Sequence, residues 1–166
     1  MSNTLDQALK RLGQDDEDYE DEDLGYREEG GEMSHDEHGN LRWGRRAAGL
    51  LIYNESNQVF LVFRSPEVFD PNMWGIPGGR VEPSETEWDA AVSESSEELG
   101  RLPPVQRVDQ KVYRSGDFTY TTFIVRMSDA DAKRWRVVLN WENTKWGWFD
   151  PKRPPEPLHP GVRAIL

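Results

Sequence analysis

Three glutamates stand close together in the middle of this 166-residue chain, within the segment SESSEELG. Glu94, Glu97 and Glu98 are spaced i, i+3, i+4. On a helix this spacing places the three carboxylates on one side, with Cβ atoms about 5–6 Å apart. Like charges so close repel one another, and a bound divalent cation would offset the repulsion. Because the donors are all oxygens, the trio suits Mg²⁺, or Mn²⁺ as a substitute, better than Zn²⁺.

Two glycines upstream of the trio decide how it is interpreted. Three glutamates alone are more often an exposed acidic helix face that binds nothing. Gly78 and Gly79 allow the backbone to approach a ligand closely, so that a carbonyl oxygen could join a metal shell. The combination favours a metal site over a plain acidic face.

The helix that must carry the trio has recognisable ends. Ser84, with Glu87 three residues later, predicts an N-terminal capping box, and Gly100 predicts a left-handed residue at the C-terminus. The buried face predicted from the helical spacing consists of Trp88, Ala91, Val92, Ser95 and Leu99. The three glutamates lie about 100° around the helix from this face, so we expect them to flank the core.

Strand-like segments lie on both sides of this helix. Residues 45–54 and 58–64 are apolar runs separated by a turn cluster, and residues 108–127 predict a hairpin that turns at 115–117. Residues 136–151 predict an extended stretch, and a short helix is expected after Pro160. This order indicates an α+β or mixed α/β domain.

The charge of the chain is concentrated at one end. The net charge is −11, and residues 1–38 account for all of it, with 14 acidic and 3 basic residues. Such a segment buries too little apolar surface to fold, so we expect an acidic, mostly disordered tail over residues 1–40 and a domain over 41–166. The tail is either a solubilising segment or one that repels nucleic acid or engages a basic protein partner.

Composition also excludes several classes of function. The absence of cysteine excludes disulfides, thiolate metal sites and a cysteine nucleophile. The chain has no apolar run of about 20 residues and no secretory signal pattern, so we expect a cytoplasmic protein without membrane contact. The balanced charge of the domain argues against binding to duplex DNA or RNA, although a free RNA end stays possible as a substrate. The oligomeric state is not indicated.

The glycines and glutamates together resemble the Nudix box, which reads Gly, five residues, Glu, seven residues, Arg-Glu, an aliphatic residue, any residue, Glu-Glu, any residue, Gly and an apolar residue. The resemblance covers about residues 43–160, because WGIPG before the box and WGWFD and LHP after it are also similar. The departures are Ser93 for arginine, Ser95 for the aliphatic residue and Arg101 for the apolar residue. The matching positions are Gly79, Glu85, Glu94, Glu97, Glu98 and Gly100.

This resemblance implies the Nudix fold, a mixed sheet between helices, and Mg²⁺-dependent cleavage of a diphosphate linkage in a nucleoside diphosphate derivative. Candidate substrates are a (d)NTP, a dinucleoside polyphosphate or a nucleotide sugar. The implied Mg²⁺ ligands are Glu94, Glu97, Glu98 and the carbonyl of Gly78, with Glu94 or Glu97 also serving as the catalytic base. Glu142 is either a further acidic group from a loop or an ordinary surface residue.

The resemblance also implies positive groups for the substrate phosphates. Arg64 and Arg80 are the candidates, and Arg45 and Arg46 are less specific ones. Trp74, Trp146 and Trp148 are candidates for stacking on a base or for ordinary packing. Because Ser93 lacks the charge of the family's arginine, the alternative is a catalytically weakened Nudix-fold module that binds a nucleotide or a partner.

Overall fold

The computed structural model describes residues 33–35, 41–43, 46–68 and 70–166 of the chain. Of the predicted tail over residues 1–40, only β1 is described, and the rest of that prediction lies outside the described residues. The strands are β1 (Met33–His35), β2 (Leu41–Trp43), β3 (Arg46–Asn54), β4 (Val59–Arg64), β5 (Trp74–Gly75), β6 (Gly78–Arg80), β7 (Gln106–Ser115), β8 (Phe118–Met127) and β9 (Asn143–Phe149). The helices are α3 (Glu87–Leu99), α4 (Asp129–Arg134) and α5 (Pro160–Arg163).

Strand β3 organises a mixed sheet. It runs parallel to β8 along its whole length, from Arg46 opposite Thr119 to Asn54 opposite Met127. On its other side it pairs antiparallel with β6 at its start and with β4 at its end. Beyond these, β7 pairs with β8, while β5 and β9 pair with β4. The predicted mixed sheet is thereby confirmed.

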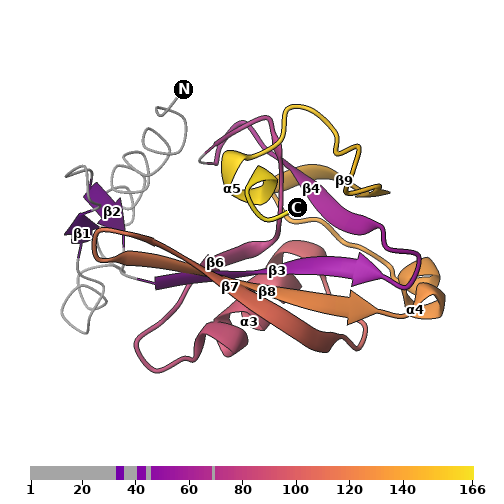
Figure 1. Ribbon diagram of the computed structural model, residues 1–166, viewed down its shortest axis with the longest axis horizontal. Helices are drawn as coiled ribbons and strands as arrows, with labels where there is room; N and C mark the ends of the chain where they lie inside the picture. The colour runs from indigo at the N-terminus through magenta and orange to yellow at the C-terminus, as the bar shows by residue number, and fades with distance from the viewer. Residues whose placement is uncertain (1–32, 36–40, 44–45, 69) are drawn as a thin grey trace.

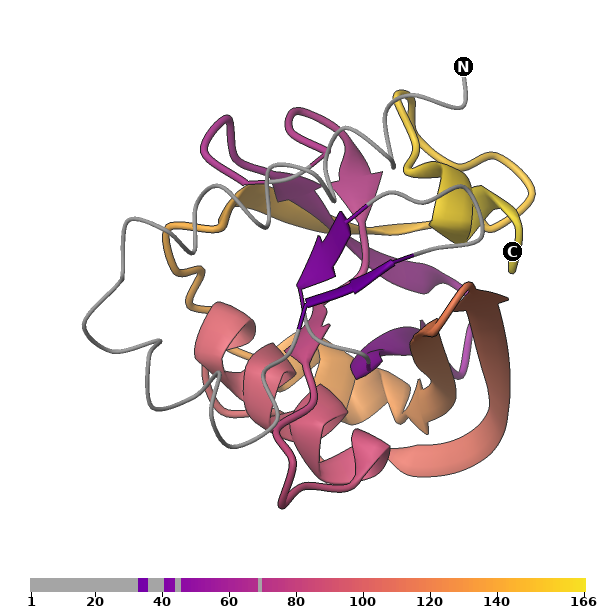
Figure 2. The same ribbon diagram turned by 90° about the vertical axis from the view of Figure 1, so that its left-hand side faces the viewer.

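Helices cover both faces of this sheet, with α3 on one side and α5 on the other (Figures 1 and 2). The alternation of side chains along β3 explains why, since Leu50 and Ile52 belong to the core cluster with α3, whereas Leu51 belongs to a second cluster. Leu158 and Val162 from the C-terminal segment complete the second cluster. The predicted sandwich of sheet and helices is confirmed.

The predicted capping box at Ser84 is wrong. Helix α3 begins two residues later, and its N-cap is Thr86, whose side chain accepts a hydrogen bond from the Asp89 amide at 3.1 Å. The reason is that Glu85 belongs to the preceding loop, where its carboxylate accepts a 3.0 Å hydrogen bond from the Glu82 amide. The C-terminal prediction is confirmed, because Gly100 has φ of 80°.

The other elements differ from prediction mainly in their limits. The hairpin of β7 and β8 turns where predicted, with Gly116 at φ of 61°, and α5 follows Pro160 as expected. The predicted extended stretch 136–151 forms a strand only at β9, because residues 140–143 close a turn. Helix α4 was not predicted. Among the described residues, no helix is long and apolar enough to cross a membrane.

Candidate active site

Strand β6 and helix α3 meet at the two glycines. A Cβ atom on Gly78 would lie 2.5 Å from the Ala48 carbonyl oxygen, and one on Gly79 would lie 2.5 Å from Oε2 of Glu94. No side chain fits either position without movement of a neighbour. The Glu94 carboxylate is therefore held directly against the backbone of the glycine segment.

Glu98 lies deeper than predicted. Its side chain is only 2% exposed, with the Gly78 amide donating to Oε2 at 2.8 Å and Asn143 Nδ2 donating to Oε1 at 2.9 Å. Burial and, to a smaller extent, the charge of Glu142 raise the pKa of Glu98 to about 8, while both hydrogen bonds and Arg64 oppose the rise. Each carboxylate oxygen keeps a second lone pair for another ligand.

Glu94 is half-buried and surrounded by like charges. Burial raises its pKa to about 7, and the charges of Glu97, Glu142 and Glu85 contribute in the same direction, against Arg80. Glu97 is exposed. The predicted Glu94 and Glu97 and two further carboxylates, Glu85 from the loop before α3 and Glu142 from the loop before β9, thus lie near enough for their charges to raise the pKa of Glu94.

Glu142 is held in place by its own loop. Burial raises its pKa, and Asn140 Nδ2 donates to Oε1 at 3.2 Å. Its carbonyl accepts a hydrogen bond from the Ser65 amide at 2.9 Å, which ties the loop to the end of β4. From the sequence, Glu142 was either a further acidic group of the site or an ordinary surface residue. Asn140 and Asn143 were not predicted to belong to the site. The signal was the run NWEN, whose asparagines frame the glutamate.

Both arginines predicted to meet phosphate lie near these carboxylates. The charge of Arg64 lowers the pKa of Glu98 and Glu142, and that of Arg80 lowers the pKa of Glu94. Arg64 Nε also donates to the carbonyl of Asp70 at 3.2 Å. The site thus combines an acidic cluster with two cationic side chains.

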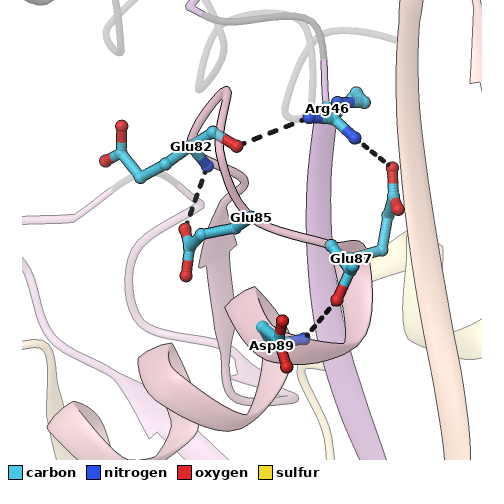
Figure 3. Close-up of polar contacts among 6 residues, drawn as sticks. Arg46, Glu82, Glu85, Glu87 and Asp89 are labelled. Atoms are coloured by element: carbon cyan, nitrogen blue, oxygen red, sulfur yellow. Dashed lines mark hydrogen bonds and ion pairs between the residues drawn. The ribbon is translucent and has the colours of Figure 1, made fainter.

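Arg46, one of the less specific candidates, supports the fold instead. Its guanidinium contacts Glu87 Oε1 at 2.7 Å and the Glu82 carbonyl at 3.4 Å (Figure 3). These contacts join β3 to the start of α3 and to the loop before it. Arg45 lies outside the described residues.

The residue whose carbonyl binds Arg64, Asp70, forms a side-chain pair with His159 that the sequence did not indicate. Asp70 is 3% exposed, and its Oδ2 lies 2.7 Å from Nε2 of His159. The Gly161 amide donates to Nδ1 of His159 at 3.0 Å, so Nε2 carries the proton and donates a hydrogen bond to Asp70. The C-terminal segment thereby holds the loop whose carbonyl binds Arg64.

The three candidate tryptophans have different surroundings. Trp74 is buried and packs edge-on against Phe63 and Phe149. Trp148 packs edge-on against Phe60, and Trp146 stacks on the same ring with a centroid distance of 5.5 Å while staying 40% exposed. Trp74 and Trp148 therefore serve packing, and Trp146 reaches the surface.

The donor set fits a hard divalent cation. Among the described residues, no three acidic or histidine side chains already converge as a metal cage. The candidate ligands are oxygens whose burial and mutual repulsion raise the pKa values of Glu94 and Glu98, and a bound cation would favour their ionised forms.

Two hollows lie elsewhere on the molecule. They have volumes of about 460 and 410 Å³, and both border Glu87 and Thr121 at the N-terminal end of α3 and the edge of the sheet. Arg107 covers part of the first by lying over the rings of Trp88 and Phe123. Neither hollow is lined by the clustered carboxylates, so both lie apart from the candidate active site at the C-terminal half of α3.

The three departures from the box have distinct consequences. Ser93 and Arg101 are exposed. Ser95 is fully buried, and its hydroxyl finds no hydrogen-bond partner among the described residues, a cost that an aliphatic residue would avoid. None of the three removes a candidate metal ligand.

A family model described as the NUDIX domain matches residues 43–166, which include this whole arrangement. The chain belongs to the Nudix family. The predicted resemblance, fold and family are confirmed.

Individual Nudix relatives carry several names. A putative 8-oxo-dGTP diphosphatase 3 of Mycobacterium tuberculosis is 33% identical over 132 residues, covering 74% of this chain and 60% of that protein. An asymmetrical bis(5'-nucleosyl)-tetraphosphatase of Caenorhabditis elegans is 40% identical over 114 residues, covering 63% of this chain and 78% of that protein. The match to this chain covers only part of the length of these relatives. It covers 34% of a putative 8-oxo-dGTP diphosphatase of Bacillus subtilis and 60% of the M. tuberculosis protein.

A solved structure agrees with the fold. The Nudix hydrolase RenU of Mycobacterium smegmatis superimposes with a TM-score of 0.67 at 28% sequence identity, covering 80% of this chain and 88% of that one. The similarity therefore extends over nearly all of the domain that the structure describes.

Proposed function

We propose that this Nudix protein is a Mg²⁺-dependent hydrolase that cleaves a phosphoanhydride bond in a nucleoside diphosphate derivative. The observation that carries the proposal is the cluster of carboxylates around Glu94 and Glu98, whose raised pKa values reflect burial and mutual charge. Arg64 and Arg80 lie beside it, so the site offers both metal ligands and phosphate-binding cations.

Each residue has a proposed role. Glu94, Glu97, Glu98 and the Gly78 carbonyl would hold the ion. Bound Mg²⁺ neutralises charge on phosphate oxygens and makes a bound water more acidic. Arg64 and Arg80 orient the phosphates, and the Asp70 carbonyl fixes the direction of Arg64.

The base that accepts the proton of the attacking water is Glu94 or Glu97. Glu94 is half-buried against Gly79, and Glu97 is exposed. The pH–rate profiles of the two Glu→Gln variants separate the candidates, because replacing the base removes the acidic limb of the profile, whereas replacing a ligand shifts the metal requirement.

The names of the relatives suggest which substrates to test. Relatives are named for 8-oxo-dGTP and for dinucleoside tetraphosphates, so the panel should contain (d)NTPs including 8-oxo-dGTP, a dinucleoside tetraphosphate, a nucleotide sugar and a 5'-triphosphate RNA end. Hydrolysis with Mg²⁺ in ¹⁸O-labelled water, analysed by mass spectrometry, reports the substrate and the phosphorus that is attacked.

The decisive variant is Glu97→Gln, with Asp89→Asn as the matched control on the exposed start of the same helix. We expect Glu97→Gln to lower kcat on the order of 100-fold or more and the control to have no effect. Glu98→Gln is a poorer choice, because both carboxylate oxygens of Glu98 accept hydrogen bonds. The NH₂ group of the new glutamine would face either the Gly78 amide or Asn143 Nδ2, both of which are donors. Equal, Mg²⁺-independent turnover by wild type and Glu97→Gln would refute the proposal.

The second candidate is a nucleotide- or partner-binding module with weakened catalysis, which the exposed Ser93 favours. The variant Ser93→Arg separates the two functions. A large rise in rate indicates a weakened enzyme, and an unchanged rate with efficient wild-type turnover indicates an enzyme adapted to serine.

A further inference from the structure

Strand β7 is an open edge of the mixed sheet (Figure 2). Among the described elements it pairs only with β8, and its residues 106–114 are exposed. They include three large hydrophobic side chains, since Val108 is 55% exposed, Val112 45% and Tyr113 51%. An edge strand carries a row of backbone amides and carbonyls without strand partners, and apolar side chains exposed on it favour pairing with a further strand.

Most of β7 lacks the features that protect an edge strand from such pairing. The strand contains no proline, and its β-bulge lies near the start, between Arg107 and Asp109. From Asp109 onward the pairing with β8 is regular up to Ser115, which is buried. The remaining protective feature is charge, since Lys111 lies in this stretch, and the register of any partner strand must accommodate it.

The pairing with β8 fixes which face each side chain of the regular stretch occupies. Gln110 lies opposite Phe123, which belongs to the core cluster with α3. Because side chains alternate along a strand, Val112 and Arg114 share this face with Gln110. In agreement, these three residues line the two hollows beside the start of α3. The opposite face carries Asp109, Lys111 and Tyr113.

Symmetry restricts how a second copy of the chain can pair with β7. In a two-fold dimer whose β7 strands run antiparallel, both copies keep the same face of the sheet on the same side. Residues directly opposite each other must therefore share a face. The axis then passes beside a single residue, which lies opposite itself, and the residues before it lie opposite those after it in the other copy.

An axis at Val112 gives the most complementary register. The two Val112 side chains lie opposite each other and bury apolar surface on the face of α3. On the same face, Gln110 supplies an amide oxygen opposite the guanidinium of Arg114, so an acceptor meets a donor. On the other face, Lys111 lies opposite Tyr113, which pairs a cation with an aromatic ring. No like charges meet in this register, and five consecutive residues of each copy take part.

Neighbouring axes fit less well. An axis at Lys111 places two lysine side chains opposite each other, which is destabilising. An axis at Gln110 brings the bulge at Val108 opposite Val112 and so interrupts the regular pairing. An axis at Tyr113 moves the paired stretch into the hairpin turn and leaves Val112 opposite a charged residue. Charge and the limits of the regular stretch therefore select the register about Val112.

We propose that β7 joins two copies of this chain into a symmetric dimer with one continuous sheet, with the two-fold axis at Val112. About four to six backbone hydrogen bonds connect the two strands, and the side-chain pairs set the register. The contact lies away from the clustered carboxylates, since Gln110 and Arg114 border the two hollows rather than the candidate active site. The inference therefore does not depend on the proposed function.

The first test measures association of the full chain by sedimentation equilibrium, in about 0.3 M salt to screen the repulsion between the two acidic segments. We expect wild-type protein to form dimers and Val112→Lys to weaken the dimer at least about tenfold, because it places two like charges opposite each other. Val108→Lys is the matched control, because it adds the same charge to the same strand at a residue that is 55% exposed and lies outside the paired stretch. We expect this control to dimerise like wild type.

The second test measures the register. The chain has no cysteine, so single introduced cysteines report contacts between copies. The cysteines of Val112→Cys lie directly opposite each other with Cβ atoms about 5 Å apart, which is close to the distance in a disulfide. Those of Val108→Cys lie about 27 Å apart along the paired strands. We expect mild oxidation to cross-link Val112→Cys as a dimer and Val108→Cys at least about tenfold less.

The outcomes decide between this dimer and other uses of the edge. Dimers weakened by Val112→Lys alone and cross-linked at position 112 alone support the inference. A full chain that stays monomeric up to about 1 mM overturns it and leaves the edge to residues 1–38 of the same chain or to another protein. Equal effects of the two lysine variants, or equal cross-linking of the two cysteine variants, also overturn it. If Val112→Lys does not fold, the cysteine variants decide alone, since cysteine is close to valine in size.

Discussion

Glu98 shows which physical effect dominates at the site. Two N–H donors and the nearby Arg64 favour the carboxylate, yet burial outweighs them and its pKa rises to about 8. A buried charge loses more hydration than two hydrogen bonds restore. The metal-free protein therefore keeps Glu98 mostly protonated at pH 7, and a cation supplies the charge that ionises it.

The same shifts predict how stability depends on pH. An unfolded glutamate titrates near 4.5, whereas Glu98 and Glu94 titrate near 8 and 7 in the folded protein. Between these values the folded state binds more protons than the unfolded state, so stability falls as pH rises from about 4.5 to 8. We expect the metal-free unfolding midpoint to drop by at least about 5 °C between pH 5 and 8.5.

Magnesium should reverse this trend, because it binds the ionised carboxylates and competes with protons. Differential scanning calorimetry across this pH range, with Mg²⁺ or EDTA, measures both effects. Glu94→Gln should flatten the metal-free curve and Asp89→Asn should not. A metal-free midpoint that rises with pH would contradict the assignment of buried, neutral carboxyls.

The adjacent glycines give a second prediction, because they meet different obstacles. An added Cβ at Gly78 meets backbone atoms of Ala48 and Gly49, whereas one at Gly79 meets the movable end of Glu94. We expect Gly78→Ala to lower the free energy of unfolding by roughly 2–3 kcal/mol. Gly79→Ala should cost less than about 1 kcal/mol but lower kcat about tenfold by displacing Glu94.

Urea unfolding and steady-state kinetics on the same preparations test the pair of glycines. Each variant serves as the control for the other, since both add one methyl group to β6. A loss of stability at Gly79 as large as that at Gly78, with kcat unaffected, would show that the Glu94 contact has no catalytic importance.

At the level of elements, the sequence predicted what short-range spacing determines. The three glutamates share a helix because they are within four residues of one another, and β3, β4, the β7–β8 hairpin and α5 follow from local patterns. The N-cap was misplaced because Glu85 serves the loop through a contact with Glu82 rather than the helix. Local spacing could not distinguish a glutamate in the first turn of the helix from one that stabilises the preceding loop.

The rest of the site depends on contacts between distant parts of the chain. Asn143 reaches Glu98 across 45 positions, and His159 reaches Asp70 across 89. No local periodicity encodes such pairs. The spacing also placed the trio beside the core but could not show that Glu98 is buried, since this requires the loop before β9 to cover it.

The Asp70–His159 pair gives a prediction for these connecting elements. Removing His159 leaves the buried Asp70 carboxylate without this donor and loosens the loop whose carbonyl holds Arg64. We expect His159→Ala to cost roughly 1–3 kcal/mol of stability and to raise KM more than it lowers kcat. Asp70→Ala and the double variant complete a double-mutant cycle by chemical denaturation and kinetics.

Additive losses in the Asp70–His159 cycle would contradict a direct interaction between the two side chains. His159→Gln is the informative rescue, because an amide can still donate a hydrogen bond to Asp70. Partial recovery of KM in His159→Gln is the expected result.

At the scale of the whole molecule, charge is divided between two parts of the chain. Residues 1–38 carry the entire net charge of −11, while the rest of the chain is balanced and holds the site. The NUDIX domain lies in the second part alone, at residues 43–166. The first part thus carries negative charge of the sign that repels a polyanion such as the proposed substrate.

This division predicts a salt-dependent effect of the acidic segment. A chain that lacks residues 1–38 should have a kcat/KM for nucleotides about 2- to 10-fold higher at 10 mM salt, because long-range repulsion of the substrate is removed. At about 0.5 M salt, screening shortens the range of charge interactions to a few ångströms, and the difference should vanish. A full-length variant with the acidic residues of 1–38 changed to Asn and Gln separates charge from length. If the neutral full-length variant behaves like wild type at 10 mM salt, or if the gain on truncation persists at 0.5 M, the segment acts through contact rather than through its field.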